Sequence, residues 1–354
     1  MKTLFVTAVA VLLSVNLFAQ NSDKPLIGAY YFDGWAGAPG QRNITDKMVK
    51  DFKERKSIWG WKTSNAQAMK EQIDLAADAG LSFFDFCWYD PETMKGNFQE
   101  SPYNQALSLF LQAPNKDRLK YCIIVCNHAK YTIDRDDWYK LTNYWIELFK
   151  TDQYLKFNGK PYIVFFSVAK LIEKFGSAQT VKDSLNVFRD RAERAGFRGL
   201  TIAGCASANQ QEIANIEDCG IDVVTAYSYH DNGFSGSNPT PVDNLINADH
   251  RIWGNVINAV NKPYVPAASV NFDRRPQARD ENDFATIKYY NGFNQASVYK
   301  TVSTLKSWII HNSRRTYENM GVIYAWNEYG EGAWLTPSEG QNESLLDGVK
   351  KALQ

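Results

Sequence analysis

The stretch AQAMKEQIDLAADAGLSFFDFCWY, residues 66–89, decides the fold because it holds one complete step from helix to strand. Residues 66–79 place apolar side chains at helical spacing, and Gly80 then suits the left-handed cap that ends many helices. Residues 81–89 form a nearly continuous apolar run, as is typical of a parallel strand covered on both faces. The stretch therefore predicts part of an α/β protein with a parallel sheet.

Similar apolar runs recur along the chain, separated by helix-periodic stretches. We predict eight strands, at residues 26–32, 81–89, 121–127, 162–168, 200–205, 223–228, 264–271 and 321–327. The predicted helices are residues 66–79, 136–150, 180–195, 242–260, 297–312 and 344–353. Eight such units most simply close into a single-domain (β/α)8 TIM barrel, residues 21–354. An open doubly wound sheet is the alternative, but no Gly-x-Gly-x-x-Gly segment follows any predicted strand.

The first residues of the chain and its charge balance indicate where the protein is located and what it can bind. Residues 1–20 have the pattern of a cleaved secretory signal peptide, with Lys2 before an apolar run and Ala19 near a cleavage point before Asn21. We therefore expect a secreted or periplasmic protein, and no later apolar stretch is long enough for a membrane span. Removing Lys2 lowers the 39 basic residues to 38, against 39 acidic ones. This balance gives no support for binding nucleic acid or an anionic membrane.

The five cysteines are Cys87, Cys122, Cys126, Cys205 and Cys219. Most lie in apolar runs, so we predict buried thiols, with a disulfide from Cys87 to Cys122 or Cys126 as the alternative. No Cys-x-x-Cys pair occurs and the chain has only 4 histidines, so no metal or other cofactor is predicted. The polar residues that follow strands also match no metal-ligand spacing; they include Asp33, Asp85, Asp90, His128 and His230.

A cluster of carboxyl and aromatic residues follows the eighth predicted strand. It reads Tyr324-Ala325-Trp326-Asn327-Glu328-Tyr329-Gly330-Glu331-Gly332-Ala333-Trp334. Residues three apart on a strand face opposite ways, so both glutamates reach one cavity only if the chain turns between them, at Tyr329-Gly330. Aromatic neighbours would desolvate the carboxyl groups, raise their pKa and favour a proton donor. Because sugar hydrolysis commonly uses two carboxyl groups, Glu328 and Glu331 are the predicted catalytic residues.

Further site residues are predicted where the other strands end, because the carboxyl ends of barrel strands meet at one rim. An aromatic content of 14% also fits a cleft lined with rings. The residues predicted to bind the sugar are Tyr30, Tyr31, Trp35, Trp88, Tyr89, Asn127, His128, Tyr227, Tyr229, Asn271, Trp326 and Trp334. For each one the alternative is a capping or turn role. Asp273, beside Arg274 and Arg275, is predicted to form an ion pair.

Two segments resemble a known family. Asn327-Glu328-Tyr329-Gly330-Glu331-Gly332 resembles the Asn-Glu-Trp-x-Glu-Gly segment of glycoside hydrolase family 99, the endo-α-mannosidases and endo-α-mannanases, and of the family-99-like proteins labelled WbsX. Gly28-Ala29-Tyr30-Tyr31-Phe32-Asp33-Gly34-Trp35 is similar to the family's Tyr-Tyr-x-x-Trp first strand. The resemblance covers the barrel in outline, residues 25–340. It implies that Glu331 is the general acid/base. It also implies that Glu328 deprotonates the sugar's 2-hydroxyl, which displaces the leaving group through an anhydro-sugar with net retention.

The segment also departs from the family pattern. Tyr329-Gly330 stands where the family has Trp-His, and residues 333–337 replace its Thr-Gln-Ile-Glu-Pro. Both glutamates are present despite these departures, but the identity of the sugar is not determined. We therefore predict an exported glycoside hydrolase acting on an α-linked oligosaccharide or polysaccharide, with an α-mannoside as one candidate. The alternatives are a non-catalytic glycan-binding protein on a hydrolase barrel, and a transferase or other barrel enzyme that acts on a surface polysaccharide.

Overall fold

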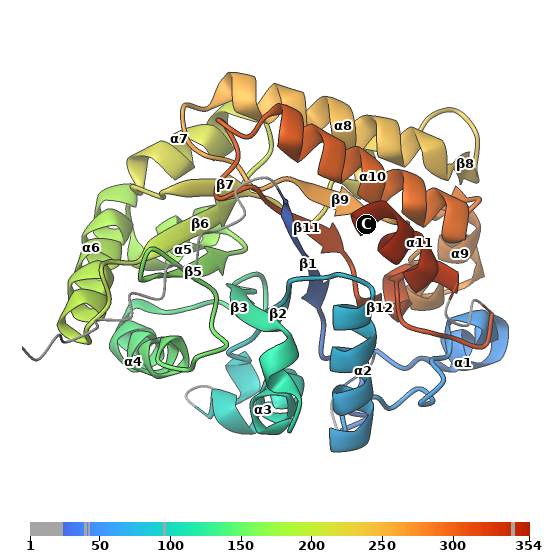
Figure 1. The fold of residues 1–354 in the computed structure, drawn as a ribbon, viewed down its shortest axis with the longest axis horizontal. Helices are drawn as coiled ribbons and strands as arrows, with labels where there is room; N and C mark the ends of the chain where they lie inside the picture. The colour runs from blue at the N-terminus through green and yellow to red at the C-terminus, as the bar shows by residue number, and fades with distance from the viewer. Residues whose placement is uncertain (1–23, 39–40, 42, 95–96, 341–343) are drawn as a thin grey trace, which may run out of the picture.

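A computed structural model describes the chain at residues 24–38, 41, 43–94, 97–340 and 344–354. The predicted signal peptide, residues 1–20, lies outside the described residues. Parallel strands form the centre of the molecule (Figure 1). They are β1 (Leu26–Tyr31), β2 (Phe83–Trp88), β3 (Lys120–Val125), β5 (Lys160–Phe165), β6 (Thr201–Cys205), β7 (Val223–Thr225), β9 (Ala267–Ser269) and β11 (Met320–Tyr324). Each lies within or next to one of the eight predicted strands.

The eight strands form a near-closed parallel barrel. Their order is β7, β6, β5, β3, β2, β1, β11, β9, and each neighbouring pair is parallel. The two outer strands approach each other through a parallel bridge between Val224 and Tyr264, and the Val265 amide donates to the Val224 carbonyl over 2.9 Å. The predicted (β/α)8 barrel is therefore confirmed, and the alternative of an open sheet is wrong.

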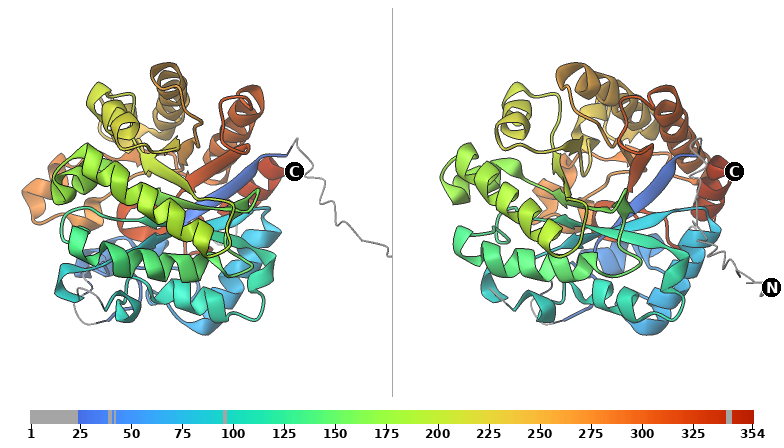
Figure 2. Two further views of the ribbon diagram at one scale, coloured as in Figure 1. Left: turned by 90° about the vertical axis from the view of Figure 1, so that its left-hand side faces the viewer. Right: turned by 60° about the vertical axis from the view of Figure 1, so that its left-hand side comes forward.

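Helices surround the strands on the outside (Figures 1 and 2). They are α1 (Asp46–Asp51), α2 (Ala66–Asp78), α3 (Gln105–Gln112), α4 (Trp138–Phe149), α5 (Val168–Phe175), α6 (Ala178–Arg194), α7 (Gln210–Asp218), α8 (Val242–Ala259), α9 (Glu281–Thr286), α10 (Gln295–His311) and α11 (Ser344–Leu353). The six predicted helices are confirmed, whereas α1, α3, α5, α7 and α9 were not predicted. In the described part of the chain, no helix is long and apolar enough to cross a membrane.

Helix α5 corrects one predicted boundary. The fourth strand was predicted to run through Val168, but β5 ends at Phe165 and α5 begins at Val168. The Ser167 side chain accepts a hydrogen bond from the Lys170 amide, and Gly176 ends the helix at a φ of 91°. A serine cap and a glycine stop with eight residues between them are signals of a helix that the apolar run concealed.

Successive side chains of a strand face either the helices or the barrel interior. On β2, Phe86 faces outward and its ring lies 5.4 Å from that of Phe110 on α3. Asp85 faces inward, where it acts on the pKa of Tyr30 from β1 and of Tyr162 from β5. The barrel therefore encloses a packed interior of its own, separate from the layer under the helices.

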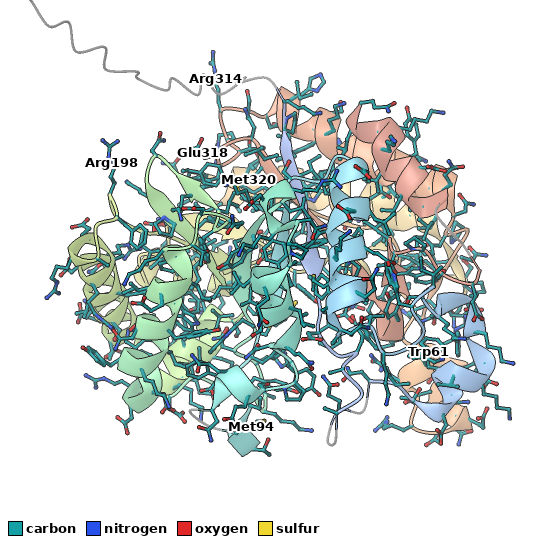
Figure 3. The ribbon with its side chains drawn as sticks, turned by 60° about the horizontal axis from the view of Figure 1, so that its bottom comes forward. Trp61, Met94, Arg198, Arg314, Glu318 and Met320 are labelled. Atoms are coloured by element: carbon teal, nitrogen blue, oxygen red, sulfur yellow. The ribbon has the colours of Figure 1, made fainter. Side chains whose placement is uncertain are left out.

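The two ends of the barrel have different roles. In Figure 3, Trp61 and Met94 lie toward the lower edge, and both belong to segments that follow strands. Arg198, Arg314 and Glu318 lie toward the upper edge and precede strands. The long segments after β1 and β2 therefore gather at the carboxyl end, which is where active sites of barrels are built.

Candidate active site

The segment after β11 folds into a small hairpin. Strands β12 (Asn327–Glu328) and β13 (Ala333–Trp334) pair antiparallel, and a 3-10 turn, Tyr329–Glu331, joins them. Gly332 ends the turn at a φ of 71°. A Cβ there would come within 3.1 Å of atoms of both Arg55 and Asp273, so the position needs glycine for backbone shape and for space. The turn predicted between the two glutamates is confirmed.

Side chains from distant segments hold this hairpin in place. The Asn327 side-chain oxygen accepts from the Phe32 amide over 2.8 Å, and the Trp35 indole donates to the Asn327 carbonyl over 2.8 Å. Asn271, after β9, donates to the Gly332 carbonyl over 2.7 Å. The hairpin is thus tied to the segments after β1 and β9, and its position follows from the closed barrel.

Each glutamate accepts a hydrogen bond from a tyrosine. The Tyr227 hydroxyl, after β7, donates to Glu328 Oε1 over 2.8 Å. The Tyr324 hydroxyl, at the end of β11, donates to Glu331 Oε2. The centroids of the two tyrosine rings lie 4.9 Å apart, so the donors form one packed unit beneath the carboxyl groups. Glu328 is only 7% exposed, and Glu331 is half-buried.

Burial raises the pKa of both glutamates. For Glu328, burial is the largest cause and the charge of Glu331 adds to it, so the pKa lies well above the usual range although the Tyr227 bond acts downward. For Glu331, burial again raises the pKa, while the Tyr324 hydrogen bond and the charge of Arg274 act to lower it. The two groups influence each other, so they titrate as a pair. A pair of this kind holds a proton to higher pH than a solvated carboxyl group does.

Both glutamates line a cavity of about 370 Å³ at the carboxyl end of the barrel. Its other walls are mostly aromatic, with polar groups at intervals, as is common for ligand sites. The lining residues are Phe32, Asn43, Tyr89, Tyr103, Cys126, His128, Tyr131, Phe166, Tyr227, His230, Gln277, Glu328 and Glu331. Burial lowers the pKa of His128 and of His230, which favours neutral rings that can both donate and accept hydrogen bonds. The cavity thus offers rings, hydroxyls, amides and a carboxyl pair.

Of the predicted site residues, the structure brings five together around this cavity: Tyr89, His128, Tyr227, Glu328 and Glu331. Three other aromatics face the helices instead. Tyr31 packs on Phe84 and Phe86 of β2, Trp88 packs 5.3 Å from Trp145 of α4, and Trp326 donates to Gln72 of α2 over 2.8 Å. Tyr31 and Trp88 occupy outward positions of β1 and β2, and Trp326 lies in the bend between β11 and β12, so all three belong to the layer under the helices.

The remaining six predicted residues are buried beside or below the cavity. Tyr30, Asn127 and Tyr229 each donate to a backbone carbonyl of another segment, over 2.7, 2.8 and 3.1 Å respectively. Trp35 and Asn271 hold the hairpin, as described above, and the Trp334 indole donates to Ser338 over 3.2 Å. These contacts are of the kind that support loops, the alternative role of strand-end residues. Tyr229 also lines a second cavity at the same end of the barrel.

The residues that sequence reasoning did not assign to sugar binding fall into two groups. Phe32, Cys126, Phe166 and His230 follow predicted strands or end them, so their positions along the chain carried a signal. The second group comes from segments with no periodic pattern, and nothing in the local sequence marks its members: Asn43, Tyr103, Tyr131 and Gln277. Tyr324 lies inside a strand, where its apolar neighbours conceal its bond to Glu331.

Asp273 forms the predicted ion pair, but with one partner that was not predicted. It lies 2.8 Å from Arg275 and 2.5 Å from Arg55, which comes from the segment after β1. Arg274 is exposed and acts on the Glu331 pKa instead. All five cysteines are free thiols, four of them buried and Cys205 half-buried. Among the described residues, no group of three or more His, Cys, Asp or Glu side chains could hold a metal ion.

The fold and this cavity define a (β/α)8 barrel with a carboxyl pair in an aromatic cavity at its carboxyl end. The chain belongs to the family described as Glycosyltransferase WbsX, whose model matches residues 60–349. The structure is similar to the GH99 endo-α-mannosidase from Bacteroides thetaiotaomicron, with 12% identity over 93% of this chain and 95% of that chain and a TM-score of 0.60. The resemblance found in two short segments is therefore confirmed.

Other solved structures share the barrel. A protein described as glycoside hydrolase-like has 14% identity over 99% of this chain and 98% of that chain, with a TM-score of 0.65. A glycoside hydrolase family 5 mannosidase from Rhizomucor miehei has 12% identity over 93% and 92% of the two chains, with a TM-score of 0.51. A comparison with curated protein sequences gives no match. At these identities the likeness shows the fold, and the chemistry must be argued from the site.

Proposed function

We propose that the protein is an exported glycoside hydrolase that cleaves an α-linked glycan with net retention. The observation that carries the proposal is the carboxyl pair, Glu328 and Glu331, buried at one aromatic cavity and bonded by tyrosine hydroxyls. Glycoside cleavage needs one carboxyl group that holds a proton and one that is ionised. A coupled buried pair meets this need over the pH range in which the two carboxyl groups together hold one proton.

The family resemblance supports one division of roles. Glu328 would take the proton of the sugar's 2-hydroxyl, whose oxygen then bonds to the anomeric carbon as the bond to the leaving oxygen breaks. Glu331 would give its proton to that leaving oxygen. Water, deprotonated by Glu331, would then attack the anomeric carbon as its bond to the 2-oxygen breaks, and Glu328 would return its proton to the 2-oxygen. Two displacements at one carbon give net retention.

The electrostatics of the substrate-free site favour the opposite starting state. Glu328 is the more buried of the pair and has the more strongly raised pKa, whereas Tyr324 and Arg274 favour the ionised form of Glu331. The role division above needs the proton on Glu331 when the glycan is bound, and the single-residue variants separate the two assignments.

The activity is tested by reducing-sugar release from a panel of α-linked mannans, glucans and galactans. Wild type should degrade one of them, and Glu331→Gln and Glu328→Gln should not. Glu339→Gln is the matched control, since Glu339 follows the hairpin and pairs with Lys56 at the surface. Equal activity in all four proteins would overturn the proposal. Glycan binding by calorimetry without turnover, unchanged in the variants, would favour the binding protein, and transfer of sugar to an acceptor glycan would favour a transferase.

Export is part of the same proposal and is supported by the pattern of residues 1–20. Expression of the full chain in a bacterial host should give a mature protein that begins near Asn21 in the periplasm or medium. Mass spectrometry of the fractionated protein checks this. An intact chain that keeps Met1 and stays in the cytoplasm would contradict it.

A further inference from the structure

A second cavity lies beside the first at the same end of the barrel, and the proposed function does not use it. Its volume is also about 370 Å³. It is built from the segments after β5, β6 and β7, with residues of helices α5 and α7, which contact each other (Figure 1). Phe166 and Tyr227 line both cavities, so the two share a wall.

The shared wall connects the second cavity to the carboxyl pair. Tyr227 donates its hydroxyl to Glu328, and its ring lies 5.6 Å from that of Phe166 and 4.8 Å from that of Tyr30. These packed rings fix Tyr227 between the two spaces. A glycan chain with one unit at Glu328 would therefore reach the second cavity by passing over Tyr227 and Phe166.

The lining of the second cavity suits an uncharged sugar. Ser207, Ser228, Asn215 and Asn232 bring hydroxyl and amide groups from three different segments. Glu212 is the one side chain with a full charge among the described lining residues. The remaining surface includes small apolar side chains and tyrosine rings. Hydroxyl groups on the edge of a pyranose match the first set, and its C–H faces match the second.

Glu212 is held in a defined position. Its Oε2 accepts hydrogen bonds from the Ser207 amide, over 2.6 Å, and from the Ser207 hydroxyl, over 2.8 Å. A fixed carboxyl group at the wall disfavours a uronic acid or a sulfated sugar, because like charges repel across an interface.

We propose that the second cavity is a glycan subsite that holds a neutral hexose of the same chain whose bond is cut at Glu328 and Glu331. This inference rests on the proposed function and extends it. Binding energy gained away from the reacting bond can be used to accelerate the reaction, so longer glycans should be better substrates than short ones.

The test fills the second cavity without touching the carboxyl pair. Ala169 is exposed, lies in the first turn of α5 and lines the second cavity, so Ala169→Trp places an indole in it. Ala259→Trp, at the exposed last residue of α8, is the matched control. The probes are ladders of α-linked manno- and gluco-oligosaccharides from the disaccharide upward. The readout is the ratio of kcat/KM for the longest to the shortest substrate, with thermal unfolding to verify folding.

Wild type and Ala259→Trp should show the same high ratio, and Ala169→Trp should lower it on the order of tenfold. An unchanged ratio in a folded Ala169→Trp protein that still cleaves the ladder overturns the subsite and leaves the hydrolase intact. If wild type cleaves none of the probes, the proposed function fails, and calorimetry decides the subsite separately. Tighter binding of longer oligosaccharides that Ala169→Trp abolishes supports it, whereas equal binding, or none, overturns it. Binding of oligogalacturonate as tight as that of neutral ladders overturns the preference for a neutral sugar.

Discussion

Asp273 and the pair formed by Glu328 and Glu331 lie side by side at the carboxyl end of the barrel, and the side chains that bond to them differ. Asp273, after β9, is paired with Arg55 and Arg275 at 2.5 and 2.8 Å. Glu328 and Glu331, after β11, are bonded by tyrosine hydroxyls. The two groups touch, since the Asp273 amide donates to the Glu331 carbonyl over 2.6 Å. An ion-paired carboxylate thus lies next to a pair of carboxyl groups that are bonded by tyrosines.

The partners decide what each carboxyl group can do. Burial acts to raise the pKa of Asp273, but its bonds to Arg275 and the charge of Arg55 outweigh burial, and the pKa is lowered. Burial also raises the pKa of Glu328 and Glu331, and there the hydroxyl bonds do not outweigh it. An arginine partner therefore makes a buried carboxylate a permanent structural charge. A tyrosine partner fixes the position of the carboxyl group and leaves its proton available.

Removing either glutamate should have the largest effect. Glu331→Gln and Glu328→Gln should each lower kcat/KM on a natural glycan by about 10²–10⁴-fold, the range for loss of an acid or base. An aryl glycoside of the same glycan has a leaving group that needs no proton. The variant that lacks the acid should therefore retain activity on it, and the variant that lacks the base should not. Retention in Glu331→Gln supports the family's division of roles, and retention in Glu328→Gln reverses it.

Removing the ion-paired carboxylate should affect stability instead. Asp273→Asn leaves Arg55 buried without its main partner, because the two side chains are only 6% and 3% exposed. We expect the free energy of unfolding, measured in urea, to fall by about 3–5 kcal/mol. Glu339→Gln breaks a surface pair with Lys56 and should cost less than about 1 kcal/mol. Equal losses in the two variants would show that the Asp273 cluster has no special structural role.

Asp85, another buried acid, tests inside the barrel whether burial without an arginine partner keeps a carboxyl group protonated. Burial raises its pKa to about 8, against a hydrogen bond with Cys122 that acts downward. The folded chain then holds a proton on Asp85 from about pH 4, where an unfolded aspartate titrates, to about pH 8. More protons bound in the folded state mean that stability falls as pH rises through this window, by at most about 1.4 kcal/mol per pH unit.

Asp85→Asn should therefore reduce the fall in unfolding free energy between about pH 5 and about pH 7, as measured by urea unfolding. Asp249, whose pKa burial also raises to about 8, keeps its own contribution in this variant. Asp78→Asn is the control, because that side chain is 63% exposed. A pH profile identical to wild type would mean that Asp85 is ionised in the folded protein.

The smallest predicted effect concerns the tyrosine donors. Tyr324→Phe removes the hydroxyl that stabilises the ionised form of Glu331, so the pKa of Glu331 should rise. We expect kcat/KM to fall on the order of tenfold, the equivalent of one hydrogen bond to a charged group. Because Glu331 is the acid in the proposed division of roles, the alkaline limb of the pH profile of kcat/KM should move to higher pH. Tyr317→Phe, which loses a bond to Thr201 at the N-terminal end of β6, should leave the profile unchanged.

The strands could be predicted because each one is a local apolar run with turn residues on both sides. Helices with a clear apolar stripe, such as α4, could be predicted for the same reason. Short helices such as α1 and α9 could not, because six residues carry less than two turns of periodicity. Helix α5 was hidden because its first residue, Val168, continues the apolar run of β5.

Among the site residues, too, only those marked by a local pattern could be predicted. Glu328 and Glu331 could be recognised because the whole turn that aims them lies in one short segment. The outward direction of Tyr31, Trp88 and Trp326 could not be read, since strands buried on both faces show no polar alternation that marks one side. For such strands, a rule based only on strand ends collects residues from both faces.

By itself, the sequence determined the eight strands, six of the helices and the carboxyl pair, since each depends on residues that are close along the chain. Only the tertiary structure decided their partners. Tyr227 lies 101 residues from Glu328, and Arg55 lies 218 residues from Asp273. Closing the barrel brings these groups together, and the resulting burial and charge set the pKa of each carboxyl group. No local pattern encodes that choice, because it depends on which side chains the closed barrel places in contact.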